Sequence, residues 1–592
     1  MDGKKGNMDA EEYESEYLEK SLNFKDMIYD AGREKELLNG WWNFNIDPFN
    51  SCIRSKWYEE RNKDGKGRHI PVDFNFDQWE KVYVPSCWNL QDEKHFYYEG
   101  SAVYTRTFNY FDKGEERVVI KFGAANYEAK VFLNKKYLGM HKGGSTPFYV
   151  EVNGILEESN RLIVVVNNTR KRTTLPCRNF DWFNYGGIYR DIELIRLPGT
   201  FIKDFSLNLV PGSSFAKLYF YLHVDGAELC GEALLEIDEL NIHEAIKIED
   251  GYGRKIIDAS PRLWSPENPT LYDIRVSYRD DSLNERIGFR EIGTKGKDIF
   301  LNGKKIYLRG ICCHEESIEN GKAITEEEII ENIRLAKDMN CNFIRLAHYP
   351  HTEKTSRLAD ELGIMLWEEI PVYWSIDFKD AGTYSDALNQ LIELINRDKN
   401  RASVIIWSVG NENADTDDRL EFMGALAQKV REYDDTRLVS AACLVDMENL
   451  RIADRLVEHL DIIGINEYYG WYDPDFDKLP KLFENSRPEK PVIITEFGAD
   501  AYPGARGTSD DLGTEDCQLE IYKRQVETIE TVPWINGTSP WILYDFRSPR
   551  RFNELQKGYN TKGLLSADKK RRKLAYYIMK QFYADRITNS GK

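Results

Sequence analysis

The chain has 592 residues, of which 41% are hydrophobic and 30% are charged. This length exceeds what a single hydrophobic core supports, and the composition is that of a folded globular protein rather than a disordered one. The formal net charge of −19 argues against nucleic acid or an anionic membrane as a partner, but it leaves room for a small anionic substrate held by local cations.

The first residues of the chain and its cysteines indicate the cellular compartment to expect for the protein. Residues 1–21 are acidic and lack an apolar core, so they predict neither a signal peptide nor a membrane anchor. The nine cysteines are scattered, with only Cys312 and Cys313 adjacent, and their spacing is typical of neither a disulfide framework nor a zinc site. We therefore expect an N-terminal extension over residues 1–21, a reducing cytoplasmic location and no bound metal.

Two β domains are predicted to come first. From about residue 22 to 200, short alternating segments such as Val118–Phe122 and Leu162–Val166 are separated by Gly, Asn and Asp turns. No long amphipathic helix interrupts them, which predicts a β-sandwich of the jelly-roll kind. Residues 201–293 continue as strands, for example Ala216–Val224, over a length that fits a small immunoglobulin-like sandwich.

From residue 294 to 592, short apolar strands alternate with helical stretches, which is typical of repeated βα units. One such stretch is Glu326–Asn340, where apolar residues recur at helical spacing. Eight strands over a length of about 290 residues predict a (β/α)8 barrel, whose chemistry lies at the carboxyl ends of its strands. The expected strands are Ile306–Ile311, Asn342–Ala347, Ile364–Ile370, Val404–Val409, Leu438–Ala442, Ile462–Asn466, Val492–Thr495 and Pro540–Phe546.

A carboxylate follows two of these apolar strands. The segment Ser403–Asn413 has the sequence SVIIWSVGNEN, in which a strand buried on both faces stops abruptly at Gly410, Asn411 and Glu412. In PVIITEFG, residues 491–498, Glu496 likewise follows an apolar strand and has a glycine close by. In a closed barrel both side chains would point into one mouth, and two facing carboxyl groups are what glycoside hydrolysis needs. Either carboxylate alone could simply cap a strand or pair with a structural arginine.

With these features, the chain resembles glycoside hydrolase family 2 from about Leu37 to Ala584. The segments that carry the resemblance are VPSCWN at Val84–Asn89, YEGSAVYTRTF at Tyr98–Phe108, FNYGGIYR at Phe183–Arg190, LWSPENPTLY at Leu263–Tyr272, GFREI at Gly288–Ile292 and LNGKKIYLRG at Leu301–Gly310. The resemblance implies a jelly roll, an immunoglobulin-like sandwich and a (β/α)8 barrel. It also implies that Glu412 is the general acid/base, that Glu496 is the nucleophile of a retaining exo-glycosidase, and that no cofactor takes part.

The family includes β-galactosidases, β-mannosidases and β-glucuronidases, so the resemblance alone leaves the sugar open. Asn560-Thr561-Lys562 is similar to the Asn-x-Lys motif by which β-glucuronidases hold the carboxylate of glucuronic acid. An amide and an ammonium two residues apart in an extended loop can point the same way and bind one carboxylate. We therefore expect the substrate to be a glucuronide, either a small molecule or an oligosaccharide.

The resemblance implies further contacts with the sugar. Asp181 would reach the sugar from the first domain, and Trp541 would form an apolar floor. His348 and Tyr468 could instead be ordinary packed residues. The full set of expected sugar contacts is Asp181, His348, Asn411, Asn466, Tyr468, Tyr472, Trp541, Asn560 and Lys562.

Two segments depart from the pattern of the family. Some β-glucuronidases have an arginine four residues before the motif asparagine, where this chain has Gln556. Some gut bacterial members also carry a long insertion after the third strand, where Pro371–Leu388 is short. We therefore expect an aglycone side that is more open and accepts larger leaving groups.

Other functions remain open from the sequence. A β-galacturonidase, or an enzyme that takes both uronic acids, differs from a β-glucuronidase only in the recognition of one hydroxyl, at C4. A carbohydrate-binding protein built on an inactive barrel is the alternative from another class, and the intact pair of Glu412 and Glu496 argues against it. We also expect the chain to form a homo-oligomer.

Overall fold

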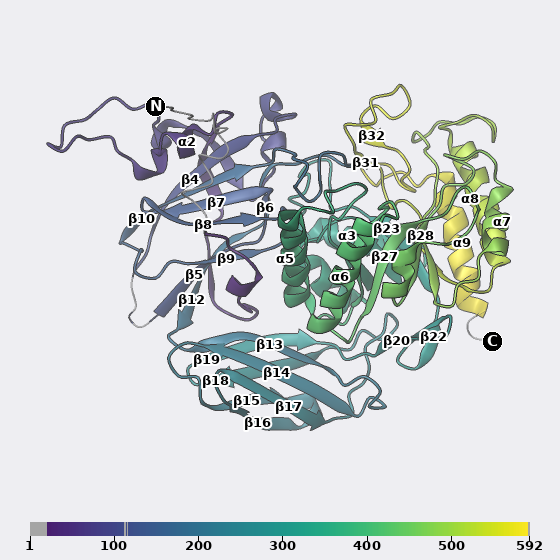
Figure 1. The fold of residues 1–592 in the computed structure, drawn as a ribbon, viewed down its shortest axis with the longest axis horizontal. Helices are drawn as coiled ribbons and strands as arrows, with labels where there is room; N and C mark the ends of the chain where they lie inside the picture. The colour runs from purple at the N-terminus through teal and green to yellow at the C-terminus, as the bar shows by residue number, and fades with distance from the viewer. Residues whose placement is uncertain (1–19, 112–113, 115, 590–592) are drawn as a thin grey trace, which may run out of the picture.

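The computed structural model describes residues 20–111, 114 and 116–589, which form three bodies (Figure 1). An N-terminal β domain lies at the upper left of the view, a smaller middle β domain lies below it, and an α/β barrel occupies the right-hand side. The expected N-terminal extension, residues 1–21, lies outside the described residues except for Lys20 and Ser21.

The N-terminal β domain consists of two antiparallel sheets. Its elements are β1 Lys35–Leu37, β2 Gly40–Ile46, α2 Ser51–Arg54, β3 Glu80–Val84, β4 Ser101–Asn109, β5 Glu116–Phe122, β6 Ala125–Asn126, β7 Glu128–Leu133, β8 Lys136–Lys142, β9 Phe148–Glu151, β10 Ser159–Asn167, β11 Gly187–Ile188 and β12 Ile192–Pro198. One sheet has the order β3-β2-β4-β10-β7-β8 and the other β1-β12-β5-β9, with a separate β11-β6 pair. Trp42, Tyr104, Ile120 and Val164 are fully buried in one apolar cluster, so the predicted β-sandwich is confirmed.

The middle β domain is a second, smaller sandwich. Its strands are β13 Phe201–Leu209, β14 Lys217–Asp225, β15 Gly231–Ile237, β16 Ile242–Ile248, β17 Tyr252–Asp258, β18 Tyr272–Tyr278 and β19 Asp281–Ile287. They form sheets of order β13-β14-β17 and β16-β15-β18-β19. Alternate residues of β14 are fully buried, namely Leu218, Phe220, Leu222 and Val224. This period of two is what a strand with one face on the core requires.

The barrel begins after a small antiparallel sheet of β20 Ile292–Lys295, β21 Asp298–Leu301 and β22 Lys304–Ile306. Its eight parallel strands are β23 Leu308–Cys313, β24 Phe343–Leu346, β25 Met365–Glu369, β26 Val404–Asn411, β27 Leu438–Leu444, β28 Ile463–Asn466, β29 Val492–Glu496 and β30 Ile535–Thr538. They close in this order, with β30 pairing to β23. The (β/α)8 barrel is therefore confirmed.

Helices surround the barrel strands. They are α3 Glu326–Asp338, α4 Glu353–Leu362, α5 Ala381–Asp398, α6 Asp417–Tyr433, α7 Lys478–Asn485, α8 Glu515–Glu530 and α9 Leu574–Asn589. Helix α3 shows how the local sequence sets these elements. Thr325 and Glu328 form a reciprocal capping box at its start, and Ile329, Ile333 and Ala336 are buried on one face. The helix predicted over Glu326–Asn340 is thus confirmed, with its end two residues earlier.

The prediction of the eighth strand was wrong. The strand is β30, whereas Pro540–Phe546 follows it as a segment that is largely irregular and packs its apolar side chains above the barrel. The sequence of β30 is INGT, in which Asn536 and Gly537 interrupt the apolar pattern of a buried strand. Gly537 is needed because a Cβ atom there would lie 2.7 Å from the Cβ atom of Leu308 on the neighbouring strand.

The first barrel strand begins two residues later than predicted. It spans Leu308–Cys313 rather than Ile306–Ile311, because Ile306 ends β22 by pairing with Ile299. The other six strands agree with the prediction to within two residues at each end. The positions of Glu412 and Glu496 relative to their strands are unaffected.

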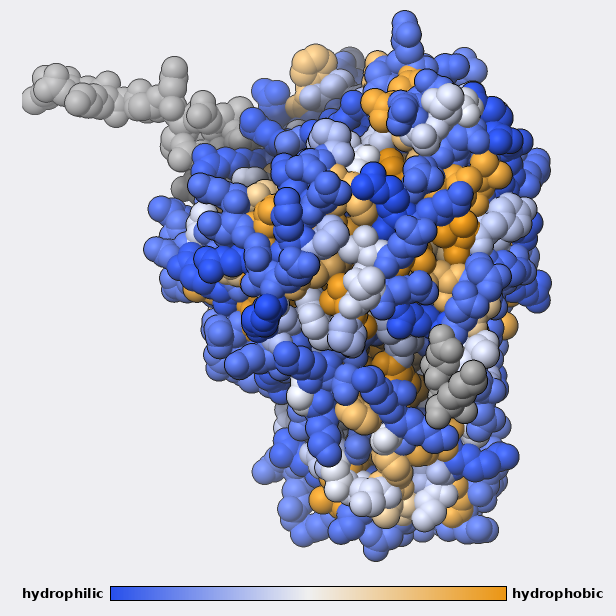
Figure 2. All heavy atoms as spheres, turned by 90° about the vertical axis from the view of Figure 1, so that its right-hand side faces the viewer, coloured by the Kyte–Doolittle hydropathy of each residue, from blue (hydrophilic) through white to orange (hydrophobic). Residues whose placement is uncertain are grey.

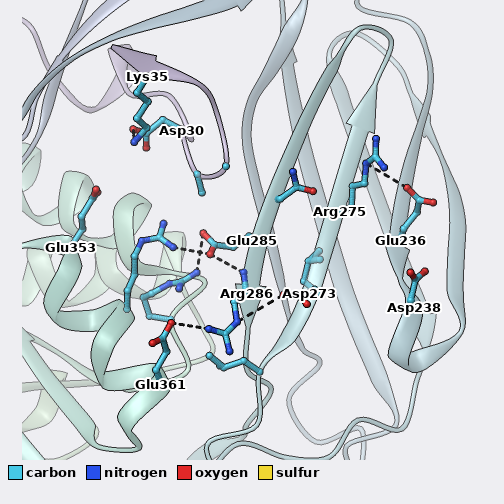
Figure 3. A pocket seen from close by; sticks show the side chains of 17 residues that line it. Asp30, Lys35, Glu236, Asp238, Asp273, Arg275, Glu285, Arg286, Glu353 and Glu361 are labelled. Carbon is cyan, nitrogen blue, oxygen red and sulfur yellow. Dashed lines mark hydrogen bonds and ion pairs between the residues drawn. The ribbon is translucent and has the colours of Figure 1, made fainter. Parts of the chain in front are cut away.

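A charged cavity of about 570 Å³ lies where the three domains meet (Figure 3). In its wall Glu285 of β19 accepts a hydrogen bond from Tyr29 at 2.6 Å and from Arg357 of α4 at 2.7 Å. Arg401 Nη2 lies 3.1 Å from the same carboxylate. Loss of Glu285 would remove the carboxylate that Arg357 and Arg401 share, and breaking a buried ion pair in this way is destabilising. This junction therefore holds the N-terminal segment, the middle domain and the barrel in one arrangement.

The face that carries α7, α8 and α9 is mainly hydrophilic, with apolar residues in small groups (Figure 2). Over residues 20–111, 114 and 116–589, none of the helices is both long enough and apolar enough to cross a membrane.

Candidate active site

Glu412 lies at the carboxyl end of the fourth barrel strand. It directly follows β26, whose eight residues are all buried. Its backbone N–H donates to the carbonyl oxygen of Ala442 on β27 at 2.8 Å. Its carboxyl group accepts two hydrogen bonds, from Asn466 Nδ2 to Oε1 at 3.0 Å and from Trp374 Nε1 to Oε2 at 2.6 Å. The carboxyl group therefore has a defined position in the barrel mouth.

Glu496 is the last residue of β29 and is 4% exposed. Arg345 Nη1 donates to its Oε1 at 2.6 Å, and the hydroxyl of Tyr468 donates to its Oε2 at 2.7 Å. The guanidinium places a positive charge at one oxygen and the phenol orients the other. A carboxylate held in this way can act as a nucleophile toward an electrophilic carbon.

Glu412 and Glu496 share the neighbour Asn466, and the charge of Glu496 acts directly on Glu412. Asn466 pairs with Glu496 across β28 and β29, and its amide also donates to Glu412. Burial raises the pKa of Glu412 to about 7 and the charge of Glu496 adds to this rise, whereas the hydrogen bonds from Asn466 and Trp374 oppose it. Glu412 can therefore carry a proton near neutral pH, as a general acid must.

His348 lies beside the Glu496 carboxylate, and Asn411 and Trp541 are linked to it through Arg345 and His348. The ring of His348 stacks on Trp541 with centroids 4.8 Å apart, and its Nε2 lies 3.9 Å from Glu496 Oε1. Asn411 Oδ1 accepts from Arg345 at 2.7 Å. The buried Nδ2 of Asn411 has no hydrogen-bond partner among the described residues. A buried donor is thus available to a ligand, since such groups are rarely left unpaired.

Asp181 reaches the barrel mouth from the N-terminal β domain. Its carboxylate accepts a hydrogen bond from Ser548 Oγ at 2.6 Å and forms an ion pair with Arg551. Asn560 Nδ2 donates to the same carboxylate at 3.3 Å. Two domains therefore contribute to one polar cluster.

Lys562 lies beside this cluster and is 1% exposed. Its backbone N–H donates to Asn560 Oδ1 at 3.2 Å, and its Nζ lies 2.5 Å from Asp500 Oδ2. The ring centroid of Tyr472 is 4.8 Å from the same Nζ. An ammonium has three donors, so donors remain for a second anion after Asp500 has taken one. The sequence did not predict that Asp181 and Asp500 would face the amide and the ammonium.

The expected site residues form one continuous network. Tyr472, which is 60% exposed, connects Lys562 to the interior because its ring lies 5.2 Å from that of Tyr468. Tyr468 in turn donates to Glu496. The structure therefore brings together all eleven residues that the sequence singled out, which are Asp181, His348, Asn411, Glu412, Asn466, Tyr468, Tyr472, Glu496, Trp541, Asn560 and Lys562. The role of each remains a prediction.

Comparison with known families covers most of the chain. The sugar-binding domain of glycosyl hydrolases family 2 matches residues 35–198, a further domain of that family matches residues 231–290, and its TIM barrel domain matches residues 292–585. The chain belongs to glycoside hydrolase family 2. It is therefore a glycoside hydrolase, and the paired carboxylates at the ends of β26 and β29 lie where a family 2 barrel places its chemistry.

Individual family 2 relatives extend over nearly the whole chain. A β-glucuronidase from Streptococcus agalactiae is 28% identical over 580 residues, which cover 87% of this chain and 94% of that protein. The crystal structure of a β-galacturonidase from Eisenbergiella tayi bound to galacturonate has a TM-score of 0.80 and 26% identity, covering 93% of this chain and 97% of that one. A β-D-glucuronidase structure from Dictyoglomus thermophilum has a TM-score of 0.79 and 26% identity, with 94% and 99% covered.

Three further residues complete this family 2 site and were not predicted from the sequence. Arg345 bridges Glu496 and Glu369, Trp374 contacts Glu412, and Asp500 contacts Lys562. Arg345 stands three residues before His348, and Asp500 four residues after Glu496. This closeness in sequence to predicted site residues is the signal by which both could have been predicted. Trp374 offered no such signal, because it lies in the loop between β25 and α5.

The structure shows where the two departures from the family pattern lie, namely Gln556 and the short segment after the third strand. Gln556 Nε2 donates to Asp500 Oδ1 at 2.8 Å, so its side chain supports the partner of Lys562. Arg551, five residues earlier, supplies a guanidinium to the same cluster through Asp181. The segment after the third strand is short as expected, since only residues 370–380 separate β25 from α5.

The pKa of Glu412 predicts how the rate of this family 2 enzyme depends on pH. Because Glu412, as the predicted general acid, must be protonated to act, kcat/KM on an alkyl uronide should fall as the pH rises through about 7. Rates measured between pH 5 and 9 test this. Glu412→Gln should abolish the alkaline limb and retain more activity on a nitrophenyl glycoside, whose leaving group needs little protonation. An unchanged limb in that variant would assign the titration to another group.

Proposed function

We propose that this protein is a retaining exo-β-glucuronidase, which releases D-glucuronate from the non-reducing end of a β-D-glucuronide. The observation that carries the proposal is the position of Asn560 and Lys562, which lie in one network with the Glu412 and Glu496 pair. The names of the relatives support a uronic acid as the substrate, since both β-glucuronidases and a β-galacturonidase are among them.

Hydrolysis proceeds in two displacements. Glu496 attacks the anomeric carbon, and Glu412 gives its proton to the glycosidic oxygen as the bond to the aglycone breaks. Glu412, now ionised, takes a proton from water, and this water attacks the anomeric carbon and frees Glu496. Two inversions leave the β configuration unchanged. The raised pKa of Glu412 fits the first step, and its return to the protonated form completes the cycle.

Lys562 and Asn560 select the substrate by its C6 carboxylate. The remaining donors of the Lys562 ammonium bind one carboxylate oxygen, and the amide of Asn560 binds close by. Asp500 holds the ammonium in place, because its Oδ1 also accepts from Thr561 Oγ1 at 2.9 Å and from Gln556. A neutral sugar has no group that could replace this charge-assisted contact.

A second candidate is a β-galacturonidase, which the likeness to the galacturonate-bound structure favours. Glucuronate and galacturonate differ in the orientation of one hydroxyl, at C4. Release of nitrophenol from the matched glucuronide and galacturonide should give a kcat/KM at least about tenfold higher for the glucuronide, since a hydrogen-bonding site rejects a misplaced hydroxyl. The nitrophenyl glucoside and galactoside serve as neutral controls. A preference for the galacturonide would replace the proposed substrate, and turnover of the neutral sugars alone would contradict a uronidase.

A further inference from the structure

Arg550 lies near the barrel mouth, and none of the described residues pairs with it as a partner of opposite charge. It belongs to the hairpin between β31 Phe546–Arg547 and β32 Tyr559–Asn560, and its side chain is exposed. The guanidinium carbon stands 4.7 Å from the centre of the Trp374 ring. Among residues 20–111, 114 and 116–589, no carboxylate comes within 4.0 Å of its nitrogens. The cation is therefore held by an aromatic face and remains available to an anion.

Trp374 is a rigid support for this cation. Its backbone N–H donates to the backbone carbonyl oxygen of Asn411 at 2.9 Å, and its own carbonyl oxygen accepts from Asn413 Nδ2 at 2.8 Å. Its ring stacks on Tyr373 with centroids 4.5 Å apart. A φ of +54° places the tryptophan in the left-handed region, which bulky residues rarely adopt unless their surroundings hold them there.

The position of Trp374 identifies the side of the site on which Arg550 lies. Asn466 contacts Glu412 Oε1 and pairs with Glu496 on the neighbouring strand, whereas Trp374 contacts the other oxygen, Oε2. In the proposed mechanism Glu412 stands beside the oxygen that leaves with the aglycone. Trp374 contacts Glu412 on the side away from Glu496, so it flanks the aglycone. Arg550 therefore lies next to the aglycone and outside the cluster around Lys562.

The charges around Arg550 favour an anion there. Arg551 is neutralised by Asp181, and Arg172 pairs with Asp377 at 3.1 Å, but Arg550 has no such partner in the part of the chain that the structure describes. Arg550 therefore keeps an available positive charge in a chain whose net charge is −19.

We propose that Arg550, supported by Trp374, forms an aglycone subsite for an anionic group, a sulfate or a carboxylate, on the leaving part of the substrate. The stacked guanidinium keeps its in-plane N–H donors free, and these fit two oxygens of one anion. The proposal rests on the proposed function and extends it, because the substrate becomes a glucuronide whose aglycone is itself acidic.

The test uses pairs of substrates that differ by one charge remote from the scissile bond. One pair is a β-glucuronyl N-acetylhexosamine disaccharide with and without a 6-sulfate, and the other is a phenyl glucuronide with a 3-carboxylate or a 3-carboxamide. Release of glucuronate gives kcat/KM for each. The unmodified enzyme should prefer at least one charged member by about three- to tenfold at low salt, and the preference should shrink as salt screens it.

Arg550→Gln should bring this ratio close to one. Lys557→Gln is the matched control, because it removes the same charge from the same hairpin at a side chain that stacks on Tyr502 instead of Trp374; it should retain the ratio. The sulfate and carboxylate pairs distinguish which anion the subsite takes. An equal ratio in the unmodified enzyme and Arg550→Gln, or the same loss in both variants, would overturn the subsite while the glucuronidase stands. Failure to hydrolyse any uronide would refute the proposed function and the subsite with it.

Discussion

Replacing Glu496 by Ala is expected to lower kcat on a glucuronide by about 10⁴- to 10⁶-fold, because removal of a nucleophile eliminates the covalent route. The loss should appear in kcat on nitrophenyl glucuronide, with binding of the substrate retained. Arg345 would lose one carboxylate partner but keep Glu369, whose Oε1 lies 3.0 Å from its Nη2. The guanidinium would therefore stay paired, and the fold should survive, as thermal unfolding can check.

A small anion should restore part of the activity of Glu496→Ala. Azide can enter the space that the side chain leaves and attack the anomeric carbon from the same face, which yields the α-glucuronyl azide. Glu467→Gln is the control, because Glu467 is a neighbouring buried carboxyl group that faces Gln525 at 3.1 Å. Burial raises its pKa to about 8, so Gln resembles its protonated form and the rate should change by less than about threefold. A β-azide product, or no rescue, would contradict the role of Glu496.

The barrel could be predicted because its strands carry a strong local signal. β26 and β29 are apolar along nearly their whole length; Glu412 directly follows the first and Glu496 ends the second, each with a glycine two residues away. β30 could not be predicted in this way, since its four residues include an asparagine and a glycine. Gly537 is required because β30 lies close to Leu308 on β23. A contact between strands that are far apart in the sequence produces no periodic pattern of apolar residues.

The candidate site was predictable where a motif carried the residue and not where packing alone placed it. Asn560 and Lys562 belong to a recognisable motif, whereas their carboxylate partners come from other segments. Asp181 lies 379 positions before Asn560, and Asp500 lies 62 positions before Lys562. Such partners are defined by distance in space, so one sequence without a fold cannot pair them.

Two domains build the proposed recognition site, which explains why the β domain matters to a barrel enzyme. Asp181 neutralises Arg551, and the hydroxyl of Ser548 joins the same carboxylate. The hairpin that carries Arg550, Arg551 and the Asn560 strand is thus anchored to the N-terminal β domain. A displaced domain would move the proposed carboxylate contacts and the proposed aglycone subsite together, even with Glu412 and Glu496 in place.

Lys562→Met is the second variant with a large expected effect, and its effect should depend on the substrate. On nitrophenyl glucuronide, kcat/KM should fall by about 10²- to 10³-fold, because the substrate carboxylate loses a charge-assisted partner in a buried site. Asp500 would also face that carboxylate with its charge uncompensated. On the matched glucoside, which has no carboxylate, the change should stay within about threefold. An equal loss on both substrates would show that Lys562 does not select the carboxylate.

The buried ion pair requires a second variant to separate recognition from stability. The Lys562 ammonium favours the ionised carboxyl group of Asp500 and lowers its pKa to about 2, although burial alone would raise it. Lys562→Met would therefore leave a buried anion and destabilise the fold by about 3–5 kcal/mol. The double variant Lys562→Met with Asp500→Asn removes both charges and should recover much of that stability. It should still discriminate poorly between glucuronide and glucoside, because the cation that distinguishes them is absent; recovery of the preference would place carboxylate recognition on other residues, such as Arg551.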